Sequence, residues 1–312
     1  MGGRKPSEGP QEVAKRLGGF RYIRTLRLNL DSVLDWINTL NSSDEMELAT
    51  SELQNQSAYD RMARTGHSLA KTVTAEELNR PLAIVDGAGW LGGSIRGWQV
   101  LCLAAAGGRH SALYNAAGAH VTVLDISDGM LELDRRVSQE LKFNVRLIQG
   151  SMLDMPMLRD AEFDLVIQPV STCYVSDVAR VFAEISRVLK PNGLYVSQHK
   201  QPINLQASLK TQRGRYAIDT ELGAVAIAAK SDEPSPLREP NTREYAHSLE
   251  AILGGICRNE MVIEDIHEPN HANKEASTDT MGHRSRFIPP YLRIKARRKG
   301  SQSKTTSGLI LP

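Results

Sequence analysis

Short apolar runs alternate with amphipathic segments from about residue 98 to residue 200, and this alternation constrains the fold more than any other feature of the chain. The apolar runs lie at 100–103, 121–125, 145–148, 163–167 and 194–197. Helical spacing of apolar side chains marks the segments between them, at 111–117, 128–141 and 177–189. Continuously apolar strands joined by helices are typical of a parallel sheet whose two faces are both covered. The sequence therefore predicts an α/β domain.

The rest of the chain divides around this region. Residues 1–30 are basic and poor in acids, and we expect a disordered extension. Residues 31–97 carry a helical pattern followed by a glycine-rich loop, which predicts a helical cap and linker. The main domain is predicted at 98–298, with a polar insertion or lid at about 201–246, and 299–312 is predicted to be a disordered tail. A helix near 246–257 and strands near 261–266 and 291–296 complete the predicted domain.

Composition excludes several classes of protein. The 312 residues carry a net charge of +2 and only 5% aromatics, which disfavours a nucleic-acid-binding surface. The cysteines, Cys102, Cys173 and Cys257, are three in number and form no C-x-x-C pair, so neither a disulfide framework nor a thiolate metal site is expected. No apolar run is long enough to span a bilayer. We expect a cytoplasmic protein without metal, present as a monomer or a homodimer.

The first predicted strand runs into a loop of small residues, Ala104-Ala105-Ala106-Gly107-Gly108. Asp125 ends the second predicted strand, about 21 residues after Ala104. Small residues let a ligand approach the backbone, a helix start offers free N–H groups, and an acid at this offset accepts hydrogen bonds from a ribose. The pattern suits a dinucleotide or an adenosyl ligand. In the alternative interpretation the loop is only a tight turn and Asp125 only caps the next helix.

The spacing of the small residues separates the two ligands. A dinucleotide fingerprint needs glycine at its sixth position, where this chain has Arg109. Positions one, three and five fall on Ala104, Ala106 and Gly108. This arrangement resembles the G-x-G-x-G loop of class I S-adenosylmethionine-dependent methyltransferases, and a nicotinamide dehydrogenase is less favoured.

Four further segments, in order, resemble motifs of that family over roughly residues 98–200. They are Asp125-Ile126-Ser127 with Met130, the G-D-A-x-D-L-P-like stretch at 149–156, the F-D-x-V-like strand at 163–167, and the E-x-x-R-V-L-K-P-G-G-like stretch at 184–193. The chain departs from the family pattern where it has Cys102 in place of an acid, alanine in place of the first two loop glycines, and Ser151 in place of aspartate.

The resemblance implies a seven-stranded, mostly parallel Rossmann-like methyltransferase sheet with helices on both faces and an antiparallel last strand. It implies S-adenosylmethionine (SAM) as cofactor and S-adenosylhomocysteine (SAH) as its product. The residues that it implies for cofactor binding are Leu103, Ala104, Ala105, Ala106, Gly108, Asp125, Ile126, Ser151, Met152, Leu153, Asp154, Gln168 and Tyr59. Tyr59 would close on the methionine end of the cofactor or else serve only helix packing.

Acceptor-side residues are expected at the carboxyl ends of the fourth and fifth strands. Tyr174 and His199 follow these strands, and both are candidates for orienting or deprotonating an acceptor. The alternatives are that His199 bonds only a loop carbonyl and that Tyr174 only lines the pocket. Cys173 is expected to be a small buried wall residue rather than a nucleophile.

The function that this resemblance favours is methyl transfer from SAM to a small-molecule acceptor. A methyltransferase acting on RNA or protein, and a protein that binds an adenosyl ligand without turnover, remain alternatives. The basic stretch near the carboxyl end, 284–299, is interpreted as a strand with a solvated face and a tail.

Overall fold

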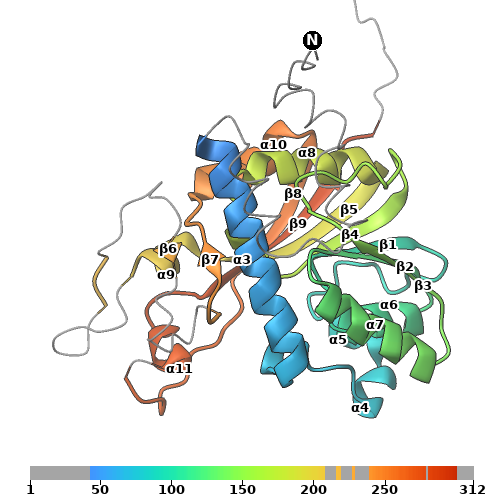
Figure 1. Cartoon of the computed structure of the whole chain (residues 1–312), viewed down its shortest axis with the longest axis horizontal. Helices are drawn as coiled ribbons and strands as arrows, with labels where there is room; N and C mark the ends of the chain where they lie inside the picture. The colour runs from blue at the N-terminus through green and yellow to red at the C-terminus, as the bar shows by residue number, and fades with distance from the viewer. Residues whose placement is uncertain (1–42, 208–215, 219–226, 229–238, 279, 301–312) are drawn as a thin grey trace, which may run out of the picture. The chain divides into compact units, whose positions relative to one another are not determined.

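The computed structural model describes residues 43–207, 216–218, 227–228, 239–278 and 280–300 (Figure 1). The predictions for 1–30, for most of 299–312 and for much of the insertion at 201–246 therefore lie outside the described residues. The chain divides into two compact units, Met1–Leu53 and Gln54–Pro312. Of the first unit only the start of helix α3 (Ser43–Thr65) is described. The predicted domain boundaries at 31, 98 and 299 stay predictions.

Seven strands form one sheet in the second unit. They are β1 (Gln99–Leu103), β2 (His120–Asp125), β3 (Val145–Gln149), β4 (Phe163–Gln168), β5 (Leu189–Lys200), β8 (Met261–His267) and β9 (Tyr291–Arg298). Their order across the sheet is β3-β2-β1-β4-β5-β9-β8. The pairs from β3 to β5 are parallel, and β9 is antiparallel to both β5 and β8. The predicted mostly parallel sheet with a reversed last strand is confirmed.

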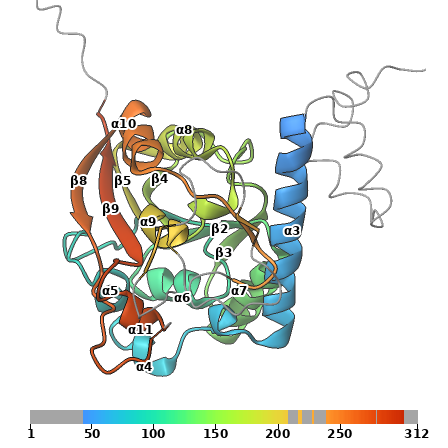
Figure 2. The ribbon, with the colours of Figure 1, turned by 90° about the vertical axis from the view of Figure 1, so that its left-hand side faces the viewer.

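Helices cover both faces of this sheet. Helices α6 (Arg109–Ala116) and α7 (Asp128–Glu140) lie on one face, and α8 (Val178–Val188) and α10 (Gly255–Arg258) lie on the other (Figures 1 and 2). Shorter elements complete the described part of the chain. They are η2 (Ser68–Ala70), α4 (Ala75–Leu78), α5 (Pro81–Val85), η3 (Thr172–Tyr174), α9 (Pro202–Gln206), the π-helix η5 (Glu250–Gly254), α11 (Met281–Arg284) and the small sheet of β6 (Ile227–Ala228) with β7 (Arg243–Glu244).

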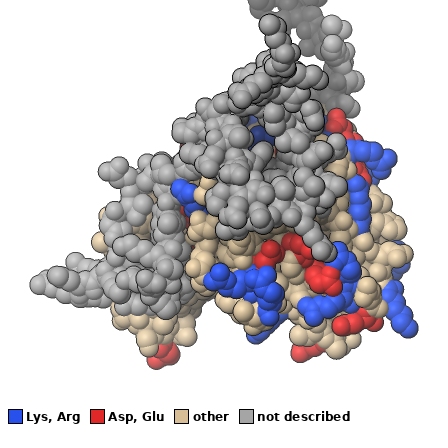
Figure 3. Space-filling view, viewed as in Figure 1, with Lys and Arg blue, Asp and Glu red and all other residues tan. Residues whose placement is uncertain are grey.

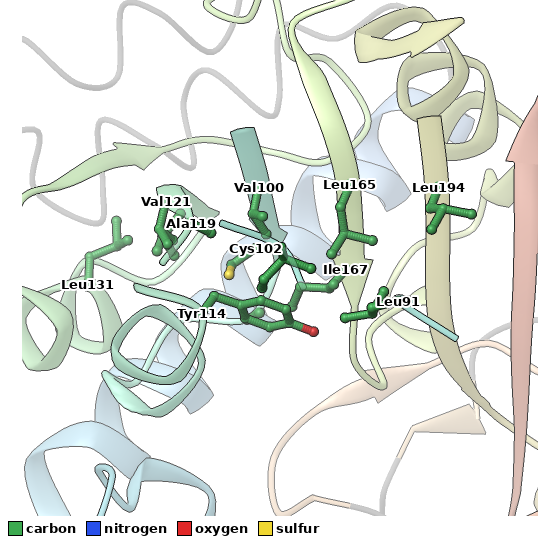
Figure 4. Close-up of a cluster of buried hydrophobic side chains, with 13 residues drawn as sticks. Leu91, Val100, Cys102, Tyr114, Ala119, Val121, Leu131, Leu165, Ile167 and Leu194 are labelled. Carbon is green, nitrogen blue, oxygen red and sulfur yellow. The ribbon is translucent and has the colours of Figure 1, made fainter. Parts of the chain in front are cut away.

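The central strands build the core. Val100, Cys102 and Leu165 are fully buried side chains of β1 and β4, and Tyr114 of α6 packs against them (Figure 4). Burial on both faces explains why the sequence reads as continuous apolar runs in these strands. Cys102, at the position where the family has an acid, is part of this hydrophobic cluster.

Strand β5 is longer than the predicted 194–197 because it starts directly where α8 ends. The pairing of β4 with β5 shifts register between Phe163 and Leu165, and residues 190–193, which lie between the predicted helix and the predicted strand, are part of β5. A Cβ on Gly193 would lie 2.9 Å from the Lys190 carbonyl oxygen, which explains glycine at this position. The helix predicted at 246–257 begins later, with the π-helical η5, and continues directly into α10.

Two residues of α8 hold the segment that follows β3. Glu184 accepts a hydrogen bond from the Met155 N–H at 2.7 Å. Arg187 donates to the carbonyl oxygens of Met155 and Leu158, both at 2.9 Å, and to the carboxylates of Glu184 and Asp160. The E-x-x-R part of the sequence motif therefore fixes the path of the chain at the end of β3.

Replacing Arg187 with alanine should lower the free energy of unfolding by about 2 kcal/mol, because two loop carbonyls and a partly buried carboxylate lose charge-assisted hydrogen bonds. Urea denaturation measures the effect. Arg159→Ala is the matched control, since its side chain is 86% exposed and 3.8 Å from Glu162, and it should change stability by less than about 0.5 kcal/mol. Equal losses in the two variants would contradict the assignment.

Candidate functional site

The loop after β1 adopts a left-handed backbone at three of its residues. Ala104 has φ of 47°, and Gly107 and Gly108 have φ of 120° and 83°. The Ala104 N–H donates to the Leu124 carbonyl at 2.7 Å and keeps the start of the loop against β2. A Cβ on Gly108 would lie 2.7 Å from Val137 Cγ2 of α7, so only glycine allows this close approach. Ala104 thus keeps, with a side chain, a conformation that glycine normally supplies.

The other residues of this loop differ in exposure. Leu103 and Ala105 are buried in the core, whereas Ala104 and Ala106 are partly exposed. The two partly exposed residues carry only a methyl group each. The backbone of the loop is therefore covered on this side by no large side chain of its own.

Asp125, at the end of β2, binds this loop through its carboxylate. Its Oδ2 accepts from the Ala106 N–H at 3.1 Å, and its Oδ1 accepts from the Ser127 N–H at 2.9 Å. The cap of α7 is Ser127, whose side chain accepts from the Met130 N–H at 3.1 Å. The interpretation in which Asp125 merely caps that helix is therefore wrong.

The environment of Asp125 raises its pKa. Burial raises the pKa to about 6, the two backbone hydrogen bonds oppose the rise, and the carboxylates of Asp134 and Asp60 add to it. Near neutral pH the group is therefore mostly ionised and accepts hydrogen bonds.

A second carboxylate, Asp134 of α7, binds the next part of the loop. Its Oδ2 accepts from the Gly107 N–H at 2.7 Å, and its Oδ1 accepts from the Ser111 hydroxyl. The side chain is fully buried. Sequence reasoning missed this residue, although an acid on the apolar face of the predicted helix, between Leu133 and Val137, was a visible signal.

The end of α3 reaches the same place through Tyr59 and Asp60. Asp60 Oδ1 accepts from the Ser127 hydroxyl at 2.6 Å and from the Gly129 N–H at 2.9 Å. A Cβ on Gly129 would lie 3.0 Å from that oxygen, so glycine permits the contact. Tyr59 and Ala106 both pack against a small buried cluster that contains Met130 and Leu133. This places the Tyr59 ring beside the loop.

The segment after β3 lies at the adjoining strand end. The Gly150 N–H donates to the Asp125 carbonyl at 2.9 Å, and Gln149 Nε2 donates to the Ile126 carbonyl at 3.2 Å. Asp154 is exposed. The three residues before it are buried: Ser151, Met152 and Leu153. The residues predicted to contact adenine are thus adjacent to Asp125, the residue predicted to bind the ribose.

Gln168, at the end of β4, is bound by neighbouring side chains. Its Nε2 donates to Ser171 Oγ at 2.9 Å and to Met152 Sδ at 3.3 Å, and its Oε1 accepts from the Tyr195 hydroxyl at 2.6 Å. The Gln168 side chain therefore connects the end of β4 to the middle of β5 and to the segment after β3.

Tyr174 lies on η3, directly after β4, and its phenol meets that of Tyr59. The Tyr59 hydroxyl donates to the Tyr174 hydroxyl at 2.9 Å, and the ring centroids are 5.6 Å apart at 75°. Tyr174 in turn donates to Glu239 Oε2 at 2.6 Å. Burial, with the neighbouring Tyr59, Cys173 and acidic groups, raises the Tyr174 pKa well above its ordinary value. The structure therefore joins a candidate cofactor residue to a candidate catalytic residue.

His199, in contrast, is fully buried within the sheet layer. Its Nδ1 lies 2.8 Å from Thr172 Oγ1, and its Nε2 lies 2.8 Å from Ser197 Oγ. Burial, with a smaller contribution from His247, lowers its pKa to about 3. The imidazole is neutral at physiological pH and both nitrogens have partners, so this geometry suits a group that positions η3.

Comparisons with known proteins address the family. A model described as a methyltransferase domain matches residues 101–197. A protein of Bacillus subtilis (strain 168), named as the uncharacterized methyltransferase YbaJ, is 39% identical over 166 residues, which are 52% of this chain and 64% of that protein. The demethylmenaquinone methyltransferase of Staphylococcus haemolyticus is 36% identical over 98 residues, covering 30% of this chain and 40% of that protein. The chain thus spans less than two thirds of these relatives.

Solved structures support the fold. An S-adenosylmethionine-dependent methyltransferase from Mesorhizobium loti superposes with a TM-score of 0.55 at 21% identity, covering 69% of this chain and all of that one. At this identity the likeness concerns the Rossmann-like methyltransferase fold.

On the face shown in Figure 3, acidic and basic side chains of the described residues are interspersed. Within the described part of the chain, no helix combines the length and apolar character needed to cross a membrane.

Replacing Ala104 with glycine should raise the free energy of unfolding by about 0.5–1 kcal/mol, because relief of the left-handed strain outweighs the added entropy of the unfolded chain. Ala105→Gly is the control, since this neighbour has no positive φ, and it should lose about 1 kcal/mol. Thermal or urea denaturation measures both, and a destabilised Ala104→Gly variant would refute the strain argument.

Proposed function

Because residues 101–197 belong to the class I S-adenosylmethionine-dependent methyltransferase family, we propose that the chain transfers a methyl group from SAM to a small-molecule acceptor. The observation that carries the proposal is the position of Asp125. Its carboxylate lies at the end of β2, bound to the backbone of the small-residue loop and ionised near neutral pH. This is the place and the charge state that recognition of a ribose diol requires.

The chain's residues fit such a cofactor. Asp125 would accept from the ribose hydroxyls, and the loop from Leu103 to Gly108 would let the amino-acid end lie along its backbone. Ile126 and the residues from Ser151 to Asp154 would contact the adenine, and Gln168, at the end of β4, would also contact the cofactor. When bound, SAM supplies a sulfonium-activated methyl carbon that an aligned nucleophile can displace, so the protein contributes mainly alignment.

The acceptor side is assigned to η3 and the neighbouring end of α3. Tyr174 would orient an acceptor or help to remove its proton, and Tyr59 would cover the methionine end of the cofactor. His199 acts here as a positioning residue, because its ring binds Thr172 of η3. A small-molecule acceptor is supported by the relative named as a demethylmenaquinone methyltransferase. We further propose a cytoplasmic monomer or homodimer.

Two alternatives differ from this function in what they predict. An RNA methyltransferase would bind its acceptor with an affinity that falls steeply as salt rises. A protein that only binds the ligand would bind SAM without ever producing SAH.

Replacing Asp125 with alanine should weaken SAM binding by about 1–3 kcal/mol, which is roughly a 5- to 150-fold rise in Kd, because ribose hydroxyls lose a charged partner. Isothermal titration calorimetry on the purified chain gives the value. Asp128→Ala serves as control, since that side chain is exposed on the first turn of α7. An unchanged Kd in Asp125→Ala would reject the ribose assignment.

Binding should also depend on pH. The Asp125 pKa of about 6 in the free protein means that the ionised, accepting form increases as pH rises through this value. The Kd for SAH should therefore fall about tenfold between about pH 5 and about pH 7. Asp125→Asn should bind more weakly and lose most of this dependence. A wild-type Kd that stays constant over the same range would contradict the proposal.

A further inference from the structure

A continuous series of hydrogen-bonded polar groups begins beside the loop after β1 and leads into the protein. It starts at the Tyr59 hydroxyl, which donates to Tyr174 at 2.9 Å, and Tyr174 donates to Glu239 Oε2 at 2.6 Å. Lys200 Nζ, at the end of β5, donates to the same Glu239 oxygen at 2.7 Å and to Glu244 Oε1 at 2.8 Å. The chain of contacts therefore connects α3, η3, β5 and β7.

The inner end of this chain is buried and unbalanced in charge. The side chains of Lys200, Glu239 and Glu244 are 4%, 18% and 0% exposed. One ammonium faces two carboxylates, so the cluster carries a net charge of −1 when both acids are ionised. An uncompensated charge at such a depth is costly, and one added proton would remove it.

One atom of the cluster lacks a hydrogen-bond partner. Glu244 Oε1 accepts from Lys200 and, at 3.4 Å, from Thr242 Oγ1. Glu244 Oε2 is buried and is without a hydrogen-bond partner in the part of the chain that the structure describes. A bare carboxylate oxygen in the interior is the place where a proton reduces the desolvation cost most.

The two acids are therefore not equivalent. Burial raises the pKa of Glu244 to about 7, with Lys200 opposing the rise and Glu239 adding to it. Burial also acts to raise the pKa of Glu239, but the adjacent Lys200 outweighs it and keeps that pKa below its ordinary value. Near neutral pH the pair is close to gaining or losing one proton.

Among the described residues, the other titratable groups whose charges act on the cluster do not supply the missing charge. Cys173 of η3 and Tyr291 of β9 both face it, and burial is the largest cause that raises the pKa of each. Both side chains stay neutral near pH 7, as do the phenols of Tyr59 and Tyr174.

We propose that Glu239 and Glu244, held together by Lys200, are the proton-accepting pair of the methyl-transfer reaction and receive the acceptor's proton through Tyr174 and Tyr59. The proposal rests on the proposed function. It predicts an acceptor whose nucleophilic oxygen carries a weakly acidic proton, such as a phenol or hydroquinone. An alkyl alcohol is too weakly acidic for a base of this strength, and a tertiary amine or thioether has no proton to lose.

The step balances in atoms and charge. The acceptor oxygen forms a bond to the methyl carbon, and the carbon–sulfur bond breaks with its electron pair moving to sulfur. The acceptor's proton passes to the Tyr59 oxygen, the Tyr59 proton passes to Tyr174, and the Tyr174 proton passes to the Glu239–Glu244 pair. The positive sulfonium and the net negative cluster both become neutral.

Infrared difference titration of the full chain tests the pair without an acceptor. Cell-free synthesis with glutamate that carries ¹³C in its side-chain carboxyl group separates the glutamate bands from those of Asp125. We expect one protonated glutamate band that titrates near pH 7 in the wild type and is absent in Glu244→Gln. Glu264→Gln, which alters an ion pair with Arg297 and Lys295 on the sheet edge, should keep the band. In Tyr174→Phe the midpoint should rise by about one pH unit, because Glu239 loses a donor that favours its charge.

The absence of any glutamate band titrating between about pH 5 and about pH 9 in the wild type would overturn the proposal without reference to any variant. An unshifted midpoint in Tyr174→Phe would show that the phenols are not linked to the pair. Single-turnover assays with SAM test the acceptor class, and transfer to a tertiary amine but not to a phenol or hydroquinone would overturn it. Calorimetry with SAM on the same wild-type sample keeps the two proposals apart, since absent binding rejects the cofactor function and leaves the titration result standing.

Discussion

Two carboxylates that bind backbone amides hold the loop after β1, and the rest of the candidate site depends on this interaction. Asp125, at the end of β2, accepts a hydrogen bond from the Ala106 N–H, and Asp134, on α7, accepts one from the Gly107 N–H. Backbone amides have the same geometry whatever side chain follows, so the loop keeps its shape although alanine occupies two glycine positions. The cost is two acids whose burial raises their pKa values, which the amide hydrogen bonds partly offset.

The loop is also the point where the chain's distant parts meet. Asp60 binds the first turn of α7, and this contact sets Tyr59 beside the loop and within hydrogen-bond distance of Tyr174. Glu184 and Arg187 bind the segment after β3 to α8. Cofactor binding, acceptor orientation and proton transfer are thus assigned to the carboxyl ends of the parallel strands, as expected for an open α/β fold.

The sequence was sufficient for the sheet because its buried parallel strands are apolar throughout and the crossover helices α7 and α8 have a clear helical period of apolar residues. It also placed Asp125 beside the loop, because strand and loop are close in the chain. It could not show that His199 has a partner at each nitrogen, or that Lys200 lies between Glu239 and Glu244. The contacts of His199 with Thr172 and of Lys200 with the two glutamates join residues that are 27, 39 and 44 positions apart, and no local pattern encodes them. Asp134 was within reach, since an acid on an apolar helix face needs a buried partner.

The left-handed conformation of Ala104 has a consequence for how such chains evolve. When acids on neighbouring elements impose the shape of a ligand loop, the glycines that usually mark it become replaceable at a tolerable cost in strain. The sequence motif of the loop can then change during evolution while its three-dimensional arrangement persists. Pattern searches that insist on glycine would pass over such chains, whereas searches that pair a strand-end acid with an inward-facing helix acid would retain them.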